Sequence, residues 1–281
     1  MKVAIVTDIH HGKPSHTKRG DTAMDQMAQF EEWVRGEKPD TVIDLGNRIN
    51  DKDAATDRVL MSDVNDAFSS FNVPVHNISG NHDRHQLSVT ENAEIMGQPM
   101  MSEVIDTGSW QIFLWRAETK ITWSETHRGF DLPESDYLWL AHQIAAAEKP
   151  TLVLSHVPVS GHSQIGNYYF QESQDLSTYP QNFRVRQALS LTRVPIVWLS
   201  GHVHRNTVTQ IDGIFHLTQQ SLTESFTTGG EPAGAWAALE LASEVSWTVK
   251  GLDPLACILP LHTKRWVPPL QPFSHGRPQQ R

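Results

Sequence analysis

Short apolar runs alternate with longer amphipathic stretches along most of the chain. Several of the short runs are rich in β-branched residues and apolar at nearly every position, which is typical of strands that are covered on both faces. We therefore expect strands at residues 3–7, 41–45, 73–78, 111–115, 151–154 and 196–199.

Apolar residues in the intervening stretches recur every three or four positions, which is the period of a helix with one buried face. This rhythm predicts helices over 24–34, with Asp21 as N-cap, and over 60–71, followed by two more over 134–148 and from Asn182 onward. Strands and helices that alternate in this way indicate a layered α/β fold with helices outside a central sheet.

The pattern changes from about residue 207. Apolar runs at 214–218, 235–241 and 246–252 are separated by Gly and polar turns, and we expect them to continue the sheet as antiparallel strands. The last residues of the chain are rich in proline, which favours an extended segment. The sequence thus predicts one domain over residues 1–252 and an extended Pro-rich C-terminal tail over residues 253–281.

Charge and composition narrow the class of protein. The chain has 281 residues and a formal net charge of −9, which argues against a nucleic-acid binder, because such proteins usually present a basic face. An anionic small molecule is compatible with this charge, since bound metal ions would reverse the local field. Cys257 is the only cysteine, so no internal disulfide forms. With no signal-peptide pattern and no apolar run of membrane-spanning length, we expect a soluble cytoplasmic protein.

Short polar motifs follow five of the expected strands directly. Because the carboxyl ends of strands in an open α/β sheet form the ligand-binding crevice, we expect these motifs to converge there. Residues two apart on an extended chain also point the same way, so a D-x-H or H-x-H pair can face one ion. The motifs are Asp8-Ile9-His10, Gly46-Asn47-Arg48, Gly80-Asn81-His82-Asp83, Ser155-His156 and Gly201-His202-Val203-His204.

Each motif has an ordinary structural explanation when it is taken alone. An Asp-x-His sequence can cap a turn, Gly-Asn is a common turn dipeptide, and a histidine at a strand end is usually packed or hydrogen-bonded. The shared position after successive strands, together with the mixture of carboxylate, amide and imidazole groups, favours a metal site over five unrelated turns. Such ligands without thiolate suit Mn²⁺, Fe or Zn²⁺.

Together the motifs resemble the signature of the calcineurin-like metallophosphoesterase family, to which class III phosphodiesterases belong, and which reads D-x-H, G-D, G-N-H-[DE], H and G-H-x-H. The resemblance covers residues 3 to about 205 and implies a four-layer α/β/β/α sandwich that holds two divalent metal ions. It makes His82 the acid near the leaving group, with Asp83 orienting it. It also implies in-line attack on phosphorus by a metal-bridging hydroxide. The ligands it implies are Asp8, His10 and His204 for the first ion and Asn81, His156 and His202 for the second.

Asn47 departs from the family pattern, which has a bridging aspartate at this position. A carboxylate offers two oxygens and a negative charge, whereas an amide offers one good oxygen and no charge, so affinity for at least one ion should fall. Asn47 is either a natural variant with weakened metal binding or an engineered substitution that traps a substrate. The otherwise intact motif favours the second explanation.

Four residues in or beside the motifs are candidates for substrate contact: Arg48, His11, His85 and His162. For each of them the alternative is a salt bridge or a hydrogen bond within the protein. The polar segment 161–179 contains Tyr168, Tyr169 and Phe170 and is either a wall of the pocket or a packed loop.

The leading hypothesis is a metal-dependent hydrolase of a small phosphodiester, with cyclic nucleotides among the candidates. The alternatives are a phosphomonoesterase, which uses the same motifs, and a non-catalytic interaction scaffold on the same fold. The sequence shows no nucleic-acid track and no membrane segment, and it is compatible with a homo-oligomer.

Overall fold

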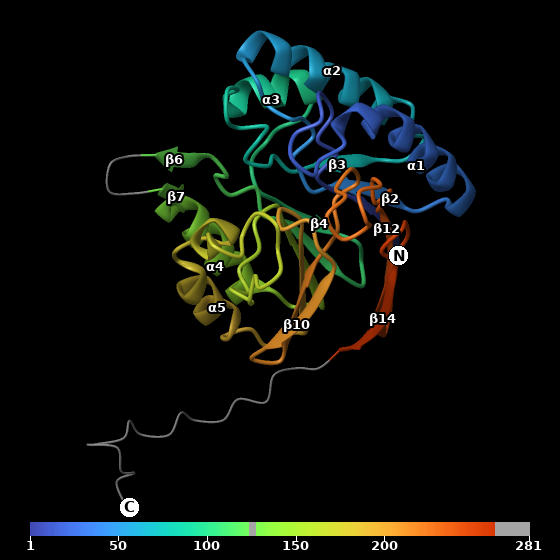
Figure 1. Ribbon diagram of the computed structural model, residues 1–281. Coiled ribbons are helices and arrows are strands. Elements are labelled where there is room, and N and C mark those ends of the chain that lie inside the picture. Colours follow the sequence, from blue (N-terminus) through green and yellow to red (C-terminus); the bar gives the residue numbers. More distant parts are fainter. Residues whose placement is uncertain (124–127, 262–281) are drawn as a thin grey trace, which may run out of the picture.

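Two six-stranded β-sheets form the centre of the protein, whose computed structural model describes residues 1–123 and 128–261 (Figure 1). In the first sheet, three parallel strands from the start of the chain lie beside three antiparallel strands from its end. The order along this sheet is β14 (Leu255–Pro260), β13 (Glu244–Val249), β12 (Ala237–Leu241), β1 (Lys2–Val6), β2 (Thr41–Asp44) and β3 (Val75–Asn77).

The second sheet has four parallel strands at its centre and one antiparallel strand at each edge. A separate hairpin of β6 (Ile121–Trp123) and β7 (Arg128–Phe130) projects beside it (Figure 1). The order along the second sheet is β10 (Thr207–Ile211), β11 (Ile214–Thr218), β9 (Ile196–Ser200), β8 (Thr151–Ser155), β5 (Gln111–Leu114) and β4 (Glu103–Asp106).

Helices cover the outer faces of both sheets, so the expected four-layer α/β/β/α arrangement is confirmed (Figure 1). Alternate residues of β1 show why its run is continuously apolar: Val3 and Ile5 face the second sheet, while Ala4 and Val6 face the helices. The first sheet carries α1 (Ala23–Glu37), α2 (Ala54–Ser69) and α3 (Val89–Met96), and the second carries α4 (Glu134–Ala146) and α5 (Asn182–Leu189). Two short 3₁₀ turns complete the helical segments, at Gly20–Thr22 and Gln174–Ser177.

Several expectations about single elements were wrong. Asp21 lies inside the first 3₁₀ turn, and Thr22 takes the N-cap position of α1. The strand Ile214–Thr218 pairs antiparallel with β10, as we expected, but it joins the sheet through a parallel pairing with β9, which we did not expect. Leu255–Pro260 pairs with β13, so the sheet continues past the expected domain boundary at residue 252. The remainder of the expected tail, from residue 262, lies outside the described residues.

Three kinds of element had not been expected at all, namely α3, the edge strands β4 and β10, and the hairpin of β6 and β7. The first of these carried a signal that we missed: Ser88 and Glu91 form a capping box at the start of α3. Among the described residues, no helix is long and apolar enough to cross a membrane.

Candidate metal centre

The loops that follow β1, β2, β3, β8 and β9 meet in one place through backbone hydrogen bonds. His10 N donates to Asn47 O at 2.9 Å, and Gly201 N donates to His156 O at 3.1 Å. Glycine is required where these loops touch, because a Cβ atom at Gly80 would lie 2.2 Å from Asn47 Oδ1. All five sequence motifs therefore converge, as the strand-end argument predicted.

Asp8, His10 and His204 form a buried cluster at the base of this site. His204 Nε2 lies 3.0 Å from His10 Nε2 and 3.2 Å from Asp8 Oδ1, and His10 Nε2 lies 3.6 Å from the same oxygen. One ion with ligand bonds of about 2.1 Å and angles of about 90–110° would separate its ligand atoms by about 3.0–3.4 Å. The three side chains therefore fit a single divalent ion.

A second group lies beside the first. His156 Nε2 is 3.1 Å from Asn81 Oδ1, and the ring centroids of His156 and His202 are 5.1 Å apart. Nδ1 of His202 is buried and has no hydrogen-bond partner, which marks it as an atom available to a ligand. Asn47 stands between the two groups, and its Nδ2 donates to Asp8 Oδ1 at 3.0 Å and to Asn81 Oδ1 at 3.3 Å. Thus the residues expected at a second ion, and the one expected between two ions, are brought together.

The other ring nitrogen of three of these histidines is held from outside the site. His204 Nδ1 contacts Glu224 Oε2 at 2.7 Å, His156 Nδ1 contacts Leu45 O at 2.8 Å, and His202 Nε2 contacts Leu176 O at 2.9 Å. Such contacts fix the ring orientation and present the opposite nitrogen to the site.

Five of the seven expected ligands have left-handed backbone conformations, at φ values from 50° to 67°. This region is uncommon for residues other than glycine, although Asn, Asp and His enter it more readily than most. Residues held in this region cluster at functional sites, where the surrounding structure enforces them. The five are Asp8, His10, Asn47, His202 and His204.

The carboxylates near His204 favour its protonated form, which places a proton where a metal ion would bind. Burial opposes protonation of His204, but Asp8 and Glu224 raise its pKa to about 9. Burial, with Lys18, lowers the pKa of His10 well below its ordinary value. At neutral pH a protonated His204 therefore donates to a neutral His10, with Asp8 beside the pair, and a metal ion would have to displace that proton.

His82 lies next to this cluster, with its ring centroid 4.8 Å from that of His10. Its Nδ1 contacts Asp51 Oδ1, and its Nε2 lies 3.3 Å from Lys18 Nζ. Burial, with the nearby Lys18, lowers the pKa of His82 to about 4, against the opposite effect of Asp51. In the free protein His82 is accordingly neutral, with Nδ1 donating to Asp51 and Nε2 accepting from Lys18.

Asp83 does not orient His82, contrary to our expectation. Its carboxylate accepts hydrogen bonds from the backbone N–H groups of Asn47, Arg48 and Gly80, at 2.8–2.9 Å. Asp83 therefore connects two of the ligand loops. Asp51, and not Asp83, lies beside His82.

The expected substrate contacts fare unevenly. Arg48 is fully buried, with its guanidinium 2.6 Å from Asp44 and 3.3 Å from Asp83, so it cannot reach a substrate. His162 bonds to Ser160 and Gln164 and does not line the pocket above the metal centre. His85 lines that pocket, whereas His11 lines an adjoining groove and lies 3.3 Å from Asp63.

The pocket above the cluster has a volume of about 390 Å³. Tyr169 and Phe170 form part of its wall, which is the first of the two interpretations that the sequence left open for the 161–179 segment. In the hairpin of β6 and β7, Arg128 stacks over the ring of Trp123 at 4.0 Å from its centroid. The functional candidates that the sequence did not reveal are Lys18, Asp51, Glu224, Trp123 and Arg128.

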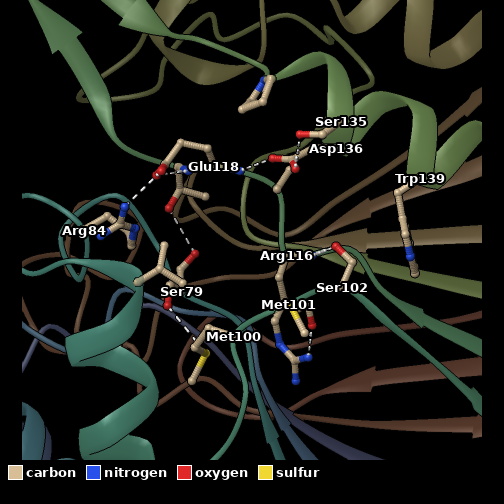
Figure 2. A pocket seen from close by; sticks show the side chains of 14 residues that line it. Ser79, Arg84, Met100, Met101, Ser102, Arg116, Glu118, Ser135, Asp136 and Trp139 are labelled. Atoms are coloured by element: carbon tan, nitrogen blue, oxygen red, sulfur yellow. Dashed lines mark hydrogen bonds and ion pairs between the residues drawn. The ribbon is translucent and has the colours of Figure 1, made fainter.

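A larger pocket of about 580 Å³ lies between the end of β3 and the start of α4 (Figure 2). None of the expected metal ligands lines it. Its charged side chains already have partners within the protein. Arg84 lies 2.9 Å from Glu118, Arg116 bonds to Glu103 and to the carbonyls of Asn77 and Met101, and Asp136 accepts a hydrogen bond from the backbone N–H of Glu118. The chemistry therefore belongs to the smaller pocket.

The fold and the ligand cluster together indicate a metal-dependent phosphoester hydrolase. Residues 1–206 match the family model of the calcineurin-like phosphoesterases, and the chain belongs to this family of metallophosphoesterases. No curated protein sequence matches the chain.

Two solved structures illustrate the likeness of fold. A dimetal phosphatase from Danio rerio is similar with a TM-score of 0.73 and 14% identity, over 93% of this chain and 99% of that chain. GAP50, described as the anchor in the inner membrane complex of Plasmodium, is similar with a TM-score of 0.59 and 14% identity, over 94% and 90% of the two chains. At such identities the likeness concerns the fold alone.

Proposed function

We propose that this metallophosphoesterase hydrolyses a small phosphodiester with the help of two divalent ions. The observation that carries the proposal is the buried cluster of Asp8, His10 and His204 beside His82, at the base of an open pocket. His82 is the proposed proton donor, because it lines this pocket while Asp51 holds its Nδ1 and leaves Nε2 for the substrate.

The first ion would be held by the Asp8 cluster and the second by Asn81, His156 and His202. Asn47 lies within hydrogen-bond distance of both groups. The chemistry that two divalent ions supply in such a site is activation of a water molecule and neutralisation of charge on the phosphate oxygens. The ligand types suit Mn²⁺, Fe or Zn²⁺.

His82 must carry a proton on Nε2 to act as an acid, although it is neutral in the free protein. An anionic phosphoryl group bound nearby favours the protonated form, since an opposite charge within about 4–6 Å stabilises it. The Asp51 carboxylate assists, because it accepts from Nδ1 and thereby favours the doubly protonated ring.

The space on both sides of His82 favours a diester over a monoester. A groove of about 710 Å³ adjoins the pocket, and His82, Lys18, Asp51 and Ser15 line both of them. A phosphoryl group above the metal cluster therefore has room for one substituent toward Tyr169 and a second in the groove.

A panel of matched aryl phosphodiesters and phosphomonoesters, assayed with Mn²⁺, tests the substrate class. We expect the diesters to be hydrolysed with the higher kcat/KM. Elemental analysis of the same samples should show bound divalent metal. Faster monoester turnover would assign the chain to the phosphomonoesterases, and absence of bound metal after Mn²⁺ soaking would overturn the site.

The role of His82 has its own test. His82→Ala should leave metal content nearly unchanged and lower the hydrolysis rate on the order of 10²–10⁴-fold. The loss should shrink for diesters with a nitrophenol leaving group, which needs less protonation. Asp51→Asn should follow the same dependence on the leaving group, whereas an equal loss for good and poor leaving groups would remove His82 from the role of acid.

A further inference from the structure

Lys18 is a buried lysine in the loop between β1 and α1. Its backbone forms a tight turn, in which Lys18 N donates to Ser15 O at 2.9 Å and Ser15 N donates to Lys18 O at 3.0 Å. A β-bridge to Glu224 fixes the same residue from the other side. With only 6% of the residue exposed, the side chain is held against the metal centre by structure far apart in the sequence.

The ammonium group of Lys18 has few partners. Within the part of the chain that the structure describes, its one hydrogen bond goes to His82 Nε2 at 3.3 Å, and the ring centroid of Tyr169 lies 5.7 Å away. Among the described residues, no carboxylate comes within ion-pair distance of Nζ, although Asp51, Glu224 and Asp8 act on it from farther away. An ammonium group has three donors, and burying it with most of them unpaired is unfavourable.

Lys18 also stands at the boundary between the two cavities. It lines both the pocket above the metal cluster and the adjoining groove, as does His82. Because Nζ lies beside His82 Nε2, an oxygen that accepts a proton from this nitrogen comes within reach of the ammonium. In a phosphoester this leaving oxygen is bonded to the phosphoryl group, so the phosphoryl group also comes close to the ammonium.

We propose that Lys18 binds the phosphoryl group of the substrate, donating to a non-bridging oxygen beside His82. This inference rests on the proposed function. In the free protein the ammonium donates to His82 Nε2. When substrate enters, the ammonium donates to the phosphoryl oxygen instead, and Nε2 takes up a proton from solvent and donates it to the leaving oxygen. Lys18 thus exchanges one acceptor for another and frees His82 for its partner, and no bond to Lys18 forms or breaks.

Calorimetric titration of the Mn²⁺-loaded protein with inorganic phosphate tests the inference without turnover. Lys18→Met should weaken phosphate binding on the order of 10–100-fold, as for the loss of a hydrogen bond between charged groups. Lys18→Arg should restore much of the affinity. Arg19→Met is the matched control, because Arg19 is exposed in the same loop and lines neither cavity, and it should bind phosphate as the wild type does.

Kinetics and thermal unfolding separate this role from a structural one. Lys18→Met should raise KM for an aryl phosphodiester by a factor similar to the loss of phosphate affinity. Its Tm should be equal to or above that of the wild type, because an underpaired buried charge is removed. Unchanged phosphate affinity in Lys18→Met would overturn the inference, as would a loss equalled by Arg19→Met. If the wild type binds phosphate but cleaves no phosphoester, the proposed function fails while the titration still decides the role of Lys18.

Discussion

Replacing Asn47 by Asp should destabilise the metal-free protein and favour the metal-loaded form. In the structure, Asn47 Nδ2 donates to Asp8 Oδ1 at 3.0 Å and to Asn81 Oδ1 at 3.3 Å, while its Oδ1 accepts from His82 N at 2.9 Å. The amide thus holds the two ligand groups together. A carboxylate of the same shape has no N–H to donate.

The geometry sets the size of the effect. Two carboxylate charges about 3–4 Å apart repel by roughly 4–6 kcal/mol at an effective dielectric constant near 20. Local rearrangement relieves part of this repulsion, so we expect Asn47→Asp to lower the unfolding free energy of the metal-free protein by about 2–4 kcal/mol. With divalent ions bound at the site the sign would change, because the additional negative charge would then be attractive. We expect activity to rise about ten-fold or more.

Two measurements on the wild type and Asn47→Asp check the predicted stability and the predicted activity. Denaturant unfolding after treatment with a chelator should show the aspartate form to be less stable, and addition of Mn²⁺ should stabilise it more than the wild type. Turnover of an aryl phosphodiester should be higher for the aspartate form, most clearly at limiting Mn²⁺. If the aspartate form is no better at limiting or saturating Mn²⁺, Asn47 is native and tuned for function, and its interpretation as a substrate trap is wrong. Equal stability without metal would contradict the hydrogen bonds that we assign to the amide.

Three further predictions concern the shell and backbone of the site. Glu224→Gln should weaken metal binding by about 10–100-fold, because the group that orients His204 loses its charge, whereas Glu231→Gln on an exposed turn should not. The pKa of His204 is raised to about 9 from 6.5, so metal affinity should rise about ten-fold per pH unit between about pH 7 and pH 9 and then level off. The proton on His204 also stabilises the metal-free protein. This contribution to stability is complete below pH 6.5 and is lost as the pH rises through 9. Calorimetry in buffers of different ionisation enthalpy counts the released proton, and a pH-independent affinity would refute the assignment. At His10, where φ is 50°, the Gly variant should be more stable than the Ala variant by about 1 kcal/mol, and the reverse order in denaturant unfolding would contradict the strain.

The strands that carry the motifs could be predicted because they are buried on both faces. Every residue of β8 and β9 is buried, and both strands therefore left nearly continuous apolar runs in the sequence. Half-exposed elements were missed for the opposite reason. The strand β4 reads Glu-Val-Ile-Asp and is at most partly buried, so its pattern is too short and too polar to stand out.

The residues that we expected as ligands come together, but partly for another reason than the one we gave. We expected Asp8 and His10 to face one ion because alternate residues of an extended chain point the same way, yet both have left-handed conformations. His202 and His204 likewise do not share a face: His204 joins the Asp8 cluster, while His202 packs against His156. The order of the family's motifs, rather than the period of a strand, matches how these side chains are grouped in the structure.

The support of the site could not be predicted from local sequence. Residues 219–224 read Gln-Gln-Ser-Leu-Thr-Glu, which resembles an exposed loop, but every one of them is fully buried. Ser221 Oγ donates to Asp8 O and Thr223 Oγ1 donates to Ile9 O, so this segment holds the D-x-H loop from behind. Lys18 and His82 are 64 positions apart, and Glu224 and His204 are 20 positions apart. The helix and strand periods of a sequence predict no contacts over such separations.

The left-handed backbone at five of the expected metal ligands limits how this site could be transplanted into a designed protein. Helices and strands have negative φ throughout, so side chains copied onto either would aim in the wrong directions even with the right residue types in the right order. Backbone copied without its surroundings would relax, because isolated residues rarely hold the left-handed conformation. The smallest portable unit therefore includes the paired ligand loops and the buried segment 219–224 behind them. A designer would have to move that whole assembly to retain the chemistry.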